Sequence, residues 1–145
     1  WTVPDGRVWR DLKTLDFRLR QGNNIALWIR WDELSNTFSL CDRSIKKSKG
    51  RRGGGLPGSP ITCGAGELPG SPLVLEGALG QLHLAETTVI GSGPTGQSVT
   101  LNLAIELGPN ATGHYAVELA ATDDFGAEDD FVQASDVLIR PAKRR

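Results

Sequence analysis

The sequence predicts an all-β domain, an antiparallel β-sandwich of about seven to nine strands. Two observations support this fold class. Apolar and polar residues alternate with a period of two along most of the chain, as expected for strands that bury one face. Turns rich in glycine, proline and asparagine interrupt the alternation, and no long window has the period of a helix. The length of 145 residues fits one domain with a sizeable core.

The first two strands are expected at residues 15–21, "LDFRLRQ", and 25–31, "IALWIRW". In the first, every second residue is apolar and would face the core. The intervening side chains would face water: Asp16, Arg18 and Arg20. The second strand is apolar on one face and carries Trp28 on the other, so both of its faces are expected to be partly covered.

Further strands follow from the same alternation. They are expected at 36–41 ("NTFSLC"), 99–107 ("VTLNLAIEL"), 114–122 ("HYAVELAAT") and 136–141 ("DVLIRP"). Turn sequences separate them, notably "GSGPTG" at 91–96, "GPNATG" at 108–113 and "DDFG" at 123–126.

One segment, residues 42–70, interrupts the alternation. It is basic at first and then rich in glycine and proline, and "LPGSP" occurs in it at 56–60 and again at 68–72. We interpret it as a long projecting loop, since loops of this length in a compact domain are functional or mobile. Cys41, just before this segment, and Cys63, within it, could form a disulfide that closes the loop, or they could be two unrelated thiols.

Charge is distributed unevenly although the net charge is only −1. Residues 43–52 carry six positive charges and no acid: Arg43, Lys46, Lys47, Lys49, Arg51 and Arg52. This run could contact a polyanion, a cell-surface glycan or the acidic loop of a neighbouring copy, or be a solvated loop. Nucleic acid is not expected, because no aromatic residue lies between these basic residues for base stacking.

An acidic run near the C-terminus supplies five carboxylates within eight residues: Asp123, Asp124, Glu128, Asp129 and Asp130. Calcium prefers hard oxygen ligands, and these residues are the candidate calcium site. The alternative is a solvated acidic turn. No other cofactor is expected.

The sequence does not indicate an enzyme. "GSGPTG" has the glycine spacing of a dinucleotide site, but an alternating strand follows it where that site needs a helix. His83 and His114 each lack a second ligand at metal spacing. Asn110 begins a glycosylation sequon, "NAT". No apolar stretch reaches the 18 residues that a membrane span needs.

The N-terminal segment reads like the end of a strand. "WTVP" is aromatic and β-branched and stops at a proline. The chain also begins without methionine, so we expect that a leader or upstream segment has been removed. The residues that we expect to anchor this segment to a partner are Trp1, Thr2, Val3, Pro4 and Trp9.

From residue 15 to residue 141, these signals resemble bacterial secreted modules of Ig-like or fibronectin-type-III-like character, often found in tandem in large cell-surface proteins. The segments that carry the resemblance are "ALWIRWDELSNTFSL", "LPGSPLVLEG", "TTVIGSG", "VTLNLAIELGP" and "TGHYAVELAATDDFG". The resemblance implies an Ig-like sandwich, an extracellular or cell-surface location and no catalytic residues. The chain departs from the pattern in its insertion at 42–70 and in the positions of its cysteines.

These observations give a division into an N-terminal linker or donor-type strand (1–10), a sandwich (11–141) and a basic tail (142–145). The expected function is that of a non-enzymatic structural module. It would belong to a tandem surface protein, or to a filament assembled head to tail through the N-terminal strand, which would pair with an open sheet edge. The alternative is an adhesion module that binds carbohydrate or polyanions through the basic loop and exposed aromatics such as Trp28.

Overall fold

A computed structural model describes residues 1–4, 6–43 and 61–141. Its regular structure is all-β, as predicted, with two single 3-10 turns, η1 (Trp9–Asp11) and η2 (Leu84–Glu86). Eleven strands are described instead of seven to nine, because several segments pair over only three or four residues. The strands are β1 (Leu12–Gln21), β2 (Asn24–Asp32), β3 (Thr37–Arg43), β4 (Ile61–Cys63), β5 (Val74–Glu76), β6 (Gly80–His83), β7 (Thr88–Gly91), β8 (Val99–Asn102), β9 (Ile105–Leu107), β10 (Gly113–Asp123) and β11 (Glu128–Ile139).

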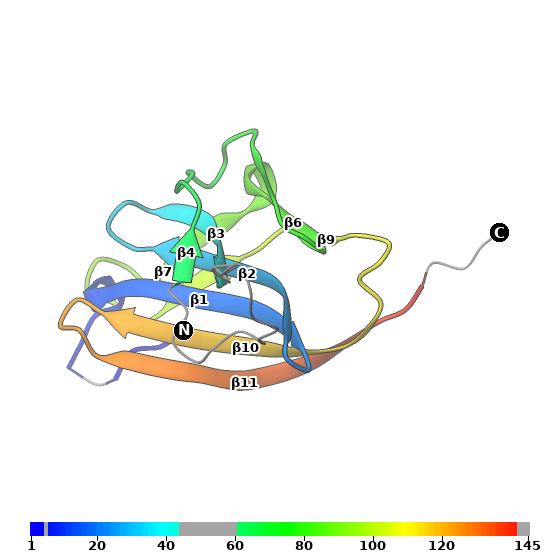
Figure 1. The fold of residues 1–145 in the computed structure, drawn as a ribbon. Helices are drawn as coiled ribbons and strands as arrows, with labels where there is room; N and C mark the ends of the chain where they lie inside the picture. Colours follow the sequence, from blue (N-terminus) through cyan, green and yellow to red (C-terminus); the bar gives the residue numbers. More distant parts are fainter. Residues whose placement is uncertain (5, 44–60, 142–145) are drawn as a thin grey trace, which may run out of the picture.

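Six strands form one large antiparallel sheet in the order β11-β10-β1-β2-β3-β4 (Figure 1). In its centre Phe17 lies opposite Leu119 on one side and opposite Ile29 on the other. Ile29 is also paired with Leu40, and Leu119 with Val132. Since directly paired residues point to the same face, these five residues form one apolar row across five strands, which we call the apolar row.

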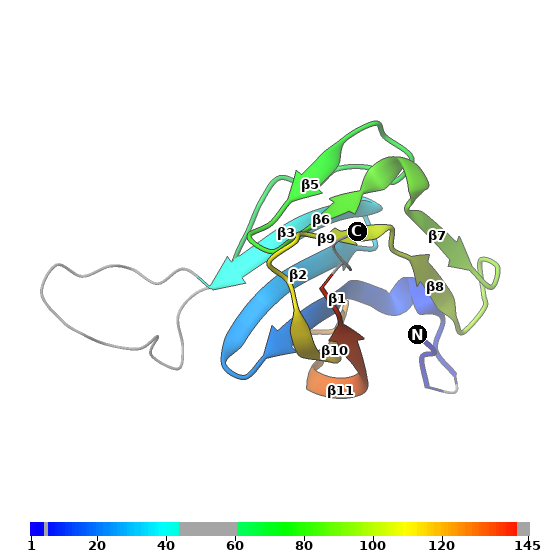
Figure 2. The ribbon, with the colours of Figure 1, turned by 90° about the vertical axis from the view of Figure 1, so that its right-hand side faces the viewer.

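Two smaller sheets, β5-β6-β9 and β7-β8, cover the face of the large sheet that bears the apolar row. They lie together on one side of the large sheet (Figure 2). The core forms between these layers, where Leu82 and Leu84 of the covering layer and Trp31 and Phe38 of the large sheet are fully buried. The arrangement is therefore sandwich-like, with unequal layers.

The run 99–107, expected as one strand, is divided between the two small sheets. β8 pairs with β7 and β9 pairs with β6. At the break, the carbonyl of Ala104 accepts the amide of His83 at 2.9 Å, and the buried Thr87 hydroxyl accepts the amide of Ala104 at 3.3 Å. Both short strands bury the same face, so the apolar alternation continues through the break. The alternation in the sequence therefore could not reveal that residues 99–107 divide between two sheets.

The motif "GSGPTG" is a tight hairpin turn between β7 and β8. Gly93 has a φ of +101°, a conformation that favours glycine. A Cβ atom on Gly91 would lie 2.4 Å from the indole of Trp9, and one on Gly96 would lie 1.9 Å from the Oγ of Ser92. The three glycines are therefore required by a turn and by close packing, and no helix follows them.

The opposite face of the large sheet is buried more than predicted. Trp28 is 2 % exposed, which confirms that β2 is covered on both faces but shows that Trp28 is not an exposed aromatic. Asp16 was expected to face water and is only 5 % exposed, and the side chain of Arg18 is 12 % exposed. The prediction of a solvated charged face is wrong here because Asp16 is paired with Arg30 and Arg18 is paired with Glu118.

Of the two alternatives for the cysteines, the disulfide is present. Cys41 of β3 lies directly opposite Cys63 of β4, with the two Cα atoms 4.0 Å apart, and a disulfide bond joins them. It fixes the short strand β4 to the large sheet. Most of the predicted basic loop, residues 44–60, lies outside the described residues.

Candidate functional site

The N-terminal strand is paired with β8 of its own chain. The amide of Val3 donates to the carbonyl of Gln97 at 2.8 Å, and Val99 exchanges two hydrogen bonds with Trp1, at 2.8 and 3.0 Å. Thr2 lies opposite Ser98 between these bonds. Residues 1–3 thus add a short antiparallel strand to the edge of the β7-β8 sheet; we call them the N-terminal strand.

The segment that contains this strand belongs to the core. Val3 is 6 % and Trp9 is 7 % exposed, and the Trp9 indole donates a 2.7 Å hydrogen bond to the carbonyl of Gly93. Arg7 forms an ion pair with Asp123, at the turn between β10 and β11. Residues 1–4 and 6–10 therefore contact the domain at several points, and the boundary predicted after residue 10 does not separate them from it.

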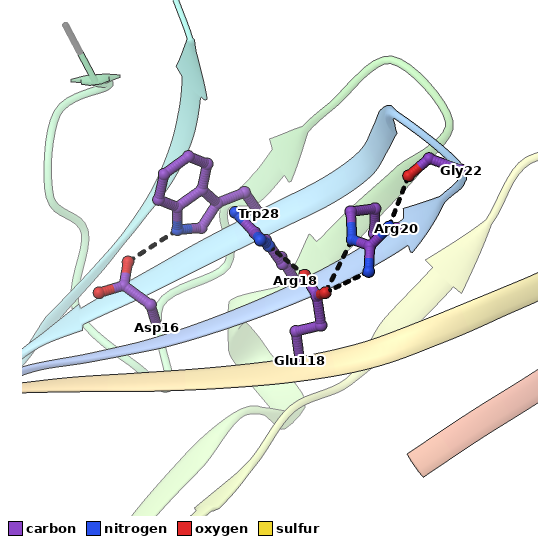
Figure 3. A network of polar contacts seen from close by, with 6 residues as sticks. All are labelled: Asp16, Arg18, Arg20, Gly22, Trp28 and Glu118. Carbon is purple, nitrogen blue, oxygen red and sulfur yellow. Dashed lines mark hydrogen bonds and ion pairs between the residues drawn. The ribbon is translucent and has the colours of Figure 1, made fainter. Parts of the chain in front are cut away.

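A second cluster lies on the outer face of the large sheet, the face opposite the apolar row (Figure 3). We call it the outer-face network, and its members are Asp16, Arg18, Arg20, Trp28, Arg30, Glu118 and Phe131. Oδ1 of Asp16 accepts the indole N–H of Trp28 at 2.7 Å and the Nε–H of Arg30 at 2.9 Å. Arg30 also donates to the second carboxylate oxygen at 3.3 Å. β1 and β2 bring these residues together because Asp16 and Arg30 are directly paired across the two strands.

Glu118 of β10 is the other acid of the outer-face network. It is 5 % exposed and accepts hydrogen bonds from Arg18, its direct partner on β1, and from Arg20 at 2.7 Å. Burial by itself would raise the pKa of Glu118, but the hydrogen bonds from Arg20 and Arg18 outweigh this effect and lower the pKa below its ordinary value. Glu118 is therefore held ionised at neutral pH.

Aromatic rings close the outer-face network. The Arg18 guanidinium lies 3.6 Å from the ring centroid of Phe131 in β11 and 5.7 Å from that of Trp28. The two rings meet edge to face with their centroids 5.3 Å apart. A cation between two rings is stabilised by the ring quadrupoles, so this arrangement fixes Arg18 and shields its ion pair with Glu118.

The outer-face network has the chemistry of a structural cluster. Both acids are bound by guanidinium groups, and Glu118, which is held ionised, is a poor proton donor. The indole N–H of Trp28 is also occupied. These groups are thus arranged to satisfy each other, and they give a stable second face to the large sheet.

The acidic residues of the candidate calcium site are used in other ways. Oδ1 of Asp123 accepts the amides of Phe125 and Ala127, and the hydrogen bond from Arg7 is the main cause that lowers its pKa. Glu128 and Asp129 begin β11 and do not belong to a loop. Across residues 1–4, 6–43 and 61–141, no group of three or more metal-ligating side chains is placed to hold a metal ion.

The remaining candidates are dispersed. Arg43 ends β3, while the other five basic residues lie outside the described part of the chain. His83 Nε2 lies 2.9 Å from Oε2 of Glu106, and His114 is an exposed residue of β10. Asn110 of the sequon is exposed in the turn before β10. No helix within the described residues is long and apolar enough to cross a membrane.

Two members of the outer-face network, Glu118 and Phe131, were not singled out from the sequence. Glu118 is the only charged residue in "HYAVELAAT", which is a signal that it faces away from the core. That it lies opposite Arg18 depends on the register of β1 against β10, which a sequence pattern does not contain.

Comparisons with protein-family models, with curated proteins and with solved structures find no match to this chain.

Proposed function

We propose that the chain is a non-enzymatic structural module of an extracellular or cell-surface protein. It acts as a building block of a tandem surface protein or of a filament that assembles head to tail through the N-terminal strand. A single observation carries the proposal: the N-terminal strand occupies the edge of β8 through backbone hydrogen bonds.

A terminal strand on a sheet edge can be exchanged between molecules. The same backbone hydrogen bonds form whether the strand comes from its own chain or from a neighbour, because backbone pairing does not depend on which molecule supplies it. Val3 supplies a buried apolar anchor for the exchanged strand. If the segment that follows Pro4 extends, the N-terminal strand of one molecule can pair with β8 of the next molecule. Repetition of this head-to-tail contact gives a linear chain of modules.

Other features support a role outside the cytosol. The Cys41–Cys63 disulfide fits an oxidising compartment. The paired acids of the outer-face network suit a module that keeps its shape and does no chemistry. The alternative of polyanion binding rests on basic residues that lie outside the described part of the chain, and it stays a prediction.

Cysteine pairs test the exchange directly. Thr2 and Ser98 lie opposite each other without direct hydrogen bonds between them, the geometry in which side chains of paired strands come closest. We expect a mixture of the Thr2→Cys variant with the Ser98→Cys variant to form disulfide-linked dimers on a non-reducing gel. Electron microscopy of the unmodified chain should show linear assemblies.

The double variant Thr2→Cys/Ser98→Cys is the matched control. Oxidation should lock the strand within its own molecule and abolish assembly, and reduction should restore it. Exclusive formation of monomers in the mixture, together with a monomeric unmodified chain at high concentration, would contradict assembly through this strand.

A further inference from the structure

A groove separates β7 from the turn that joins β2 to β3. Its volume is about 440 Å³, within the range of about 300–1,000 Å³ that is typical of small-molecule sites. The N-terminal strand lies on the other edge of the β7-β8 sheet, so the groove is separate from the edge proposed for assembly. Its lining includes Trp9 and Arg10 of η1, Glu33 and Asn36 of the β2–β3 turn, and Val89 and Gly91 of β7.

The edge of β7 that borders the groove has unpaired backbone groups. Val99 exchanges its backbone hydrogen bonds with Trp1, so its direct partner in β7, Gly91, forms no hydrogen bond with it. The amide and carbonyl of Gly91 therefore point away from β8, and those of Val89, two positions along the strand, point the same way. No other residue that the structure describes forms a hydrogen bond with these groups.

The opposite side of the groove has a nearly buried acid with a free oxygen. The side chain of Glu33 is only 9 % exposed, and its Oε1 accepts a 2.9 Å hydrogen bond from Arg10. The second oxygen, Oε2, receives no hydrogen bond from the residues that the structure covers. A carboxylate in so restricted a place has lost much of its hydration, and a donor at Oε2 would compensate for that loss. Glu33 thus offers an acceptor to a bound molecule.

Asn36 offers a donor beside this acceptor. Its Oδ1 accepts the indole N–H of Trp31 at 3.0 Å. An indole can only donate, so this contact fixes the orientation of the amide and leaves its Nδ2 group as a donor. Asn36 has a φ of +49°, a left-handed conformation that asparagine adopts more readily than most residues. The groove therefore has donors and acceptors on both of its sides.

We propose that this groove binds one uncharged sugar residue of a glycan. A sugar hydroxyl both donates and accepts, so neighbouring hydroxyls can bond Gly91 on one side and Glu33 and Asn36 on the other. The nonpolar face of a sugar ring fits the apolar part of the lining, which includes Trp9 and Pro94. The site goes beyond the proposed structural role, and it is distinct from the basic loop and from Trp28.

The charges and the length of the β7 edge decide between ligand classes. Arg10 and Glu33 neutralise each other, so neither an anion nor a cation meets an excess of opposite charge. An extended polypeptide could use the edge of β7, but this strand begins just after η2 and ends at the tight turn of Gly93. The edge offers the groups of Val89 and Gly91, about 7 Å apart along the strand. One sugar ring with its hydroxyls spans this distance, whereas a strand gains little pairing from it.

A titration with simple glycosides tests the site on the monomeric chain. The probes are the methyl glycosides of glucose, galactose, mannose and N-acetylglucosamine, each at up to about 50 mM, because a ligand of this size binds in the millimolar range. We expect at least one of them to shift the NMR signals of the Gly91 amide and the Asn36 side-chain amide in a saturable manner. An unshifted Gly91 signal with all of the sugars would overturn the site.

Two variants locate the contact. Glu33→Gln keeps the shape of the side chain but removes its charge, and Asn36→Gly keeps the backbone conformation but removes the donor. Each should weaken binding at least about fivefold. Ile90→Thr is the matched control and should leave the affinity unchanged, because Ile90 lies between Val89 and Gly91 with its side chain 58 % exposed on the other face of β7. Equal affinities in all of these variants would contradict binding in the groove.

A peptide separates the sugar from the polypeptide alternative. The probe is a short acetylated and amidated peptide of alternating valine and threonine. If this peptide shifts the Gly91 amide at millimolar concentration and no sugar does, the groove accepts a strand and the proposal is wrong. None of these measurements involves Thr2 or Ser98, so they can fail while the cysteine cross-link between molecules succeeds, and the reverse also holds.

Discussion

The indole N–H of Trp28 donates a hydrogen bond to Oδ1 of Asp16, 2.7 Å away, on the face of the large sheet opposite the main core. Both residues are nearly fully buried. A buried carboxylate next to a tryptophan is tolerated here because Arg30 supplies the compensating charge at 2.9 Å. The second face of the sheet therefore depends on polar pairing and not on apolar burial alone.

Removal of the Asp16 carboxylate should destabilise the fold. In the Asp16→Ala variant, the buried indole N–H of Trp28 and the guanidinium of Arg30 both lose their acceptor. We expect a loss of about 1–3 kcal/mol in the free energy of unfolding, measured by urea denaturation. Trp28→Phe combined with Asp16→Ala should lose less than the sum of the single variants. Gln133→Ala, which removes an exposed hydrogen bond to Asp136, should cost little.

The pH dependence of stability should contain a contribution from Glu118. Its pKa is lower in the folded state than its ordinary value of 4.5, so its stabilising contribution is present above about pH 4.5 and is lost as the pH falls through the folded pKa. We expect Glu118→Gln to be less stable than the unmodified chain at pH 7. The difference in unfolding free energy should shrink at pH values well below 4.5, and a difference independent of pH would exclude this contribution.

Loss of the disulfide should lower stability without changing the sheet. It closes a loop between residues 22 positions apart, for which unfolded-state entropy gives roughly 3 kcal/mol. We expect the Cys41→Ala/Cys63→Ala variant to lose about this amount in urea denaturation and to keep the circular dichroism spectrum of a β protein. A reducing agent should produce the same loss in the unmodified chain and no change in the variant.

Replacement of Gly91 should disturb Trp9. A Cβ atom at this position would lie 2.4 Å from the indole, whose hydrogen bond to Gly93 fixes η1 against the β7-β8 turn. We expect Gly91→Ala to cost about 1–3 kcal/mol by overpacking and to change the fluorescence of the chain. Gly64→Ala is the control, because the nearest atom to its added Cβ would lie 3.8 Å away; equal costs for both would contradict the packing argument.

Local patterns were sufficient for the fold class and for most long strands. The alternation in β1, β2 and β10 follows directly from which side chains are apolar, and a period of two admits few structures other than a strand with one buried face. The patterns failed where pairing partners matter. They did not show that residues 99–107 divide between two sheets or that residues 128–130 belong to β11.

The sequence by itself determined that this chain is an all-β, sandwich-like protein, because this property depends on local alternation and on residue types. Only the tertiary structure decided that Asp16 and Glu118 are buried in ion pairs and that the N-terminal strand lies on β8. These properties depend on the register between strands far apart in the sequence. Register is set by the combined packing of all strands, and no single segment records it.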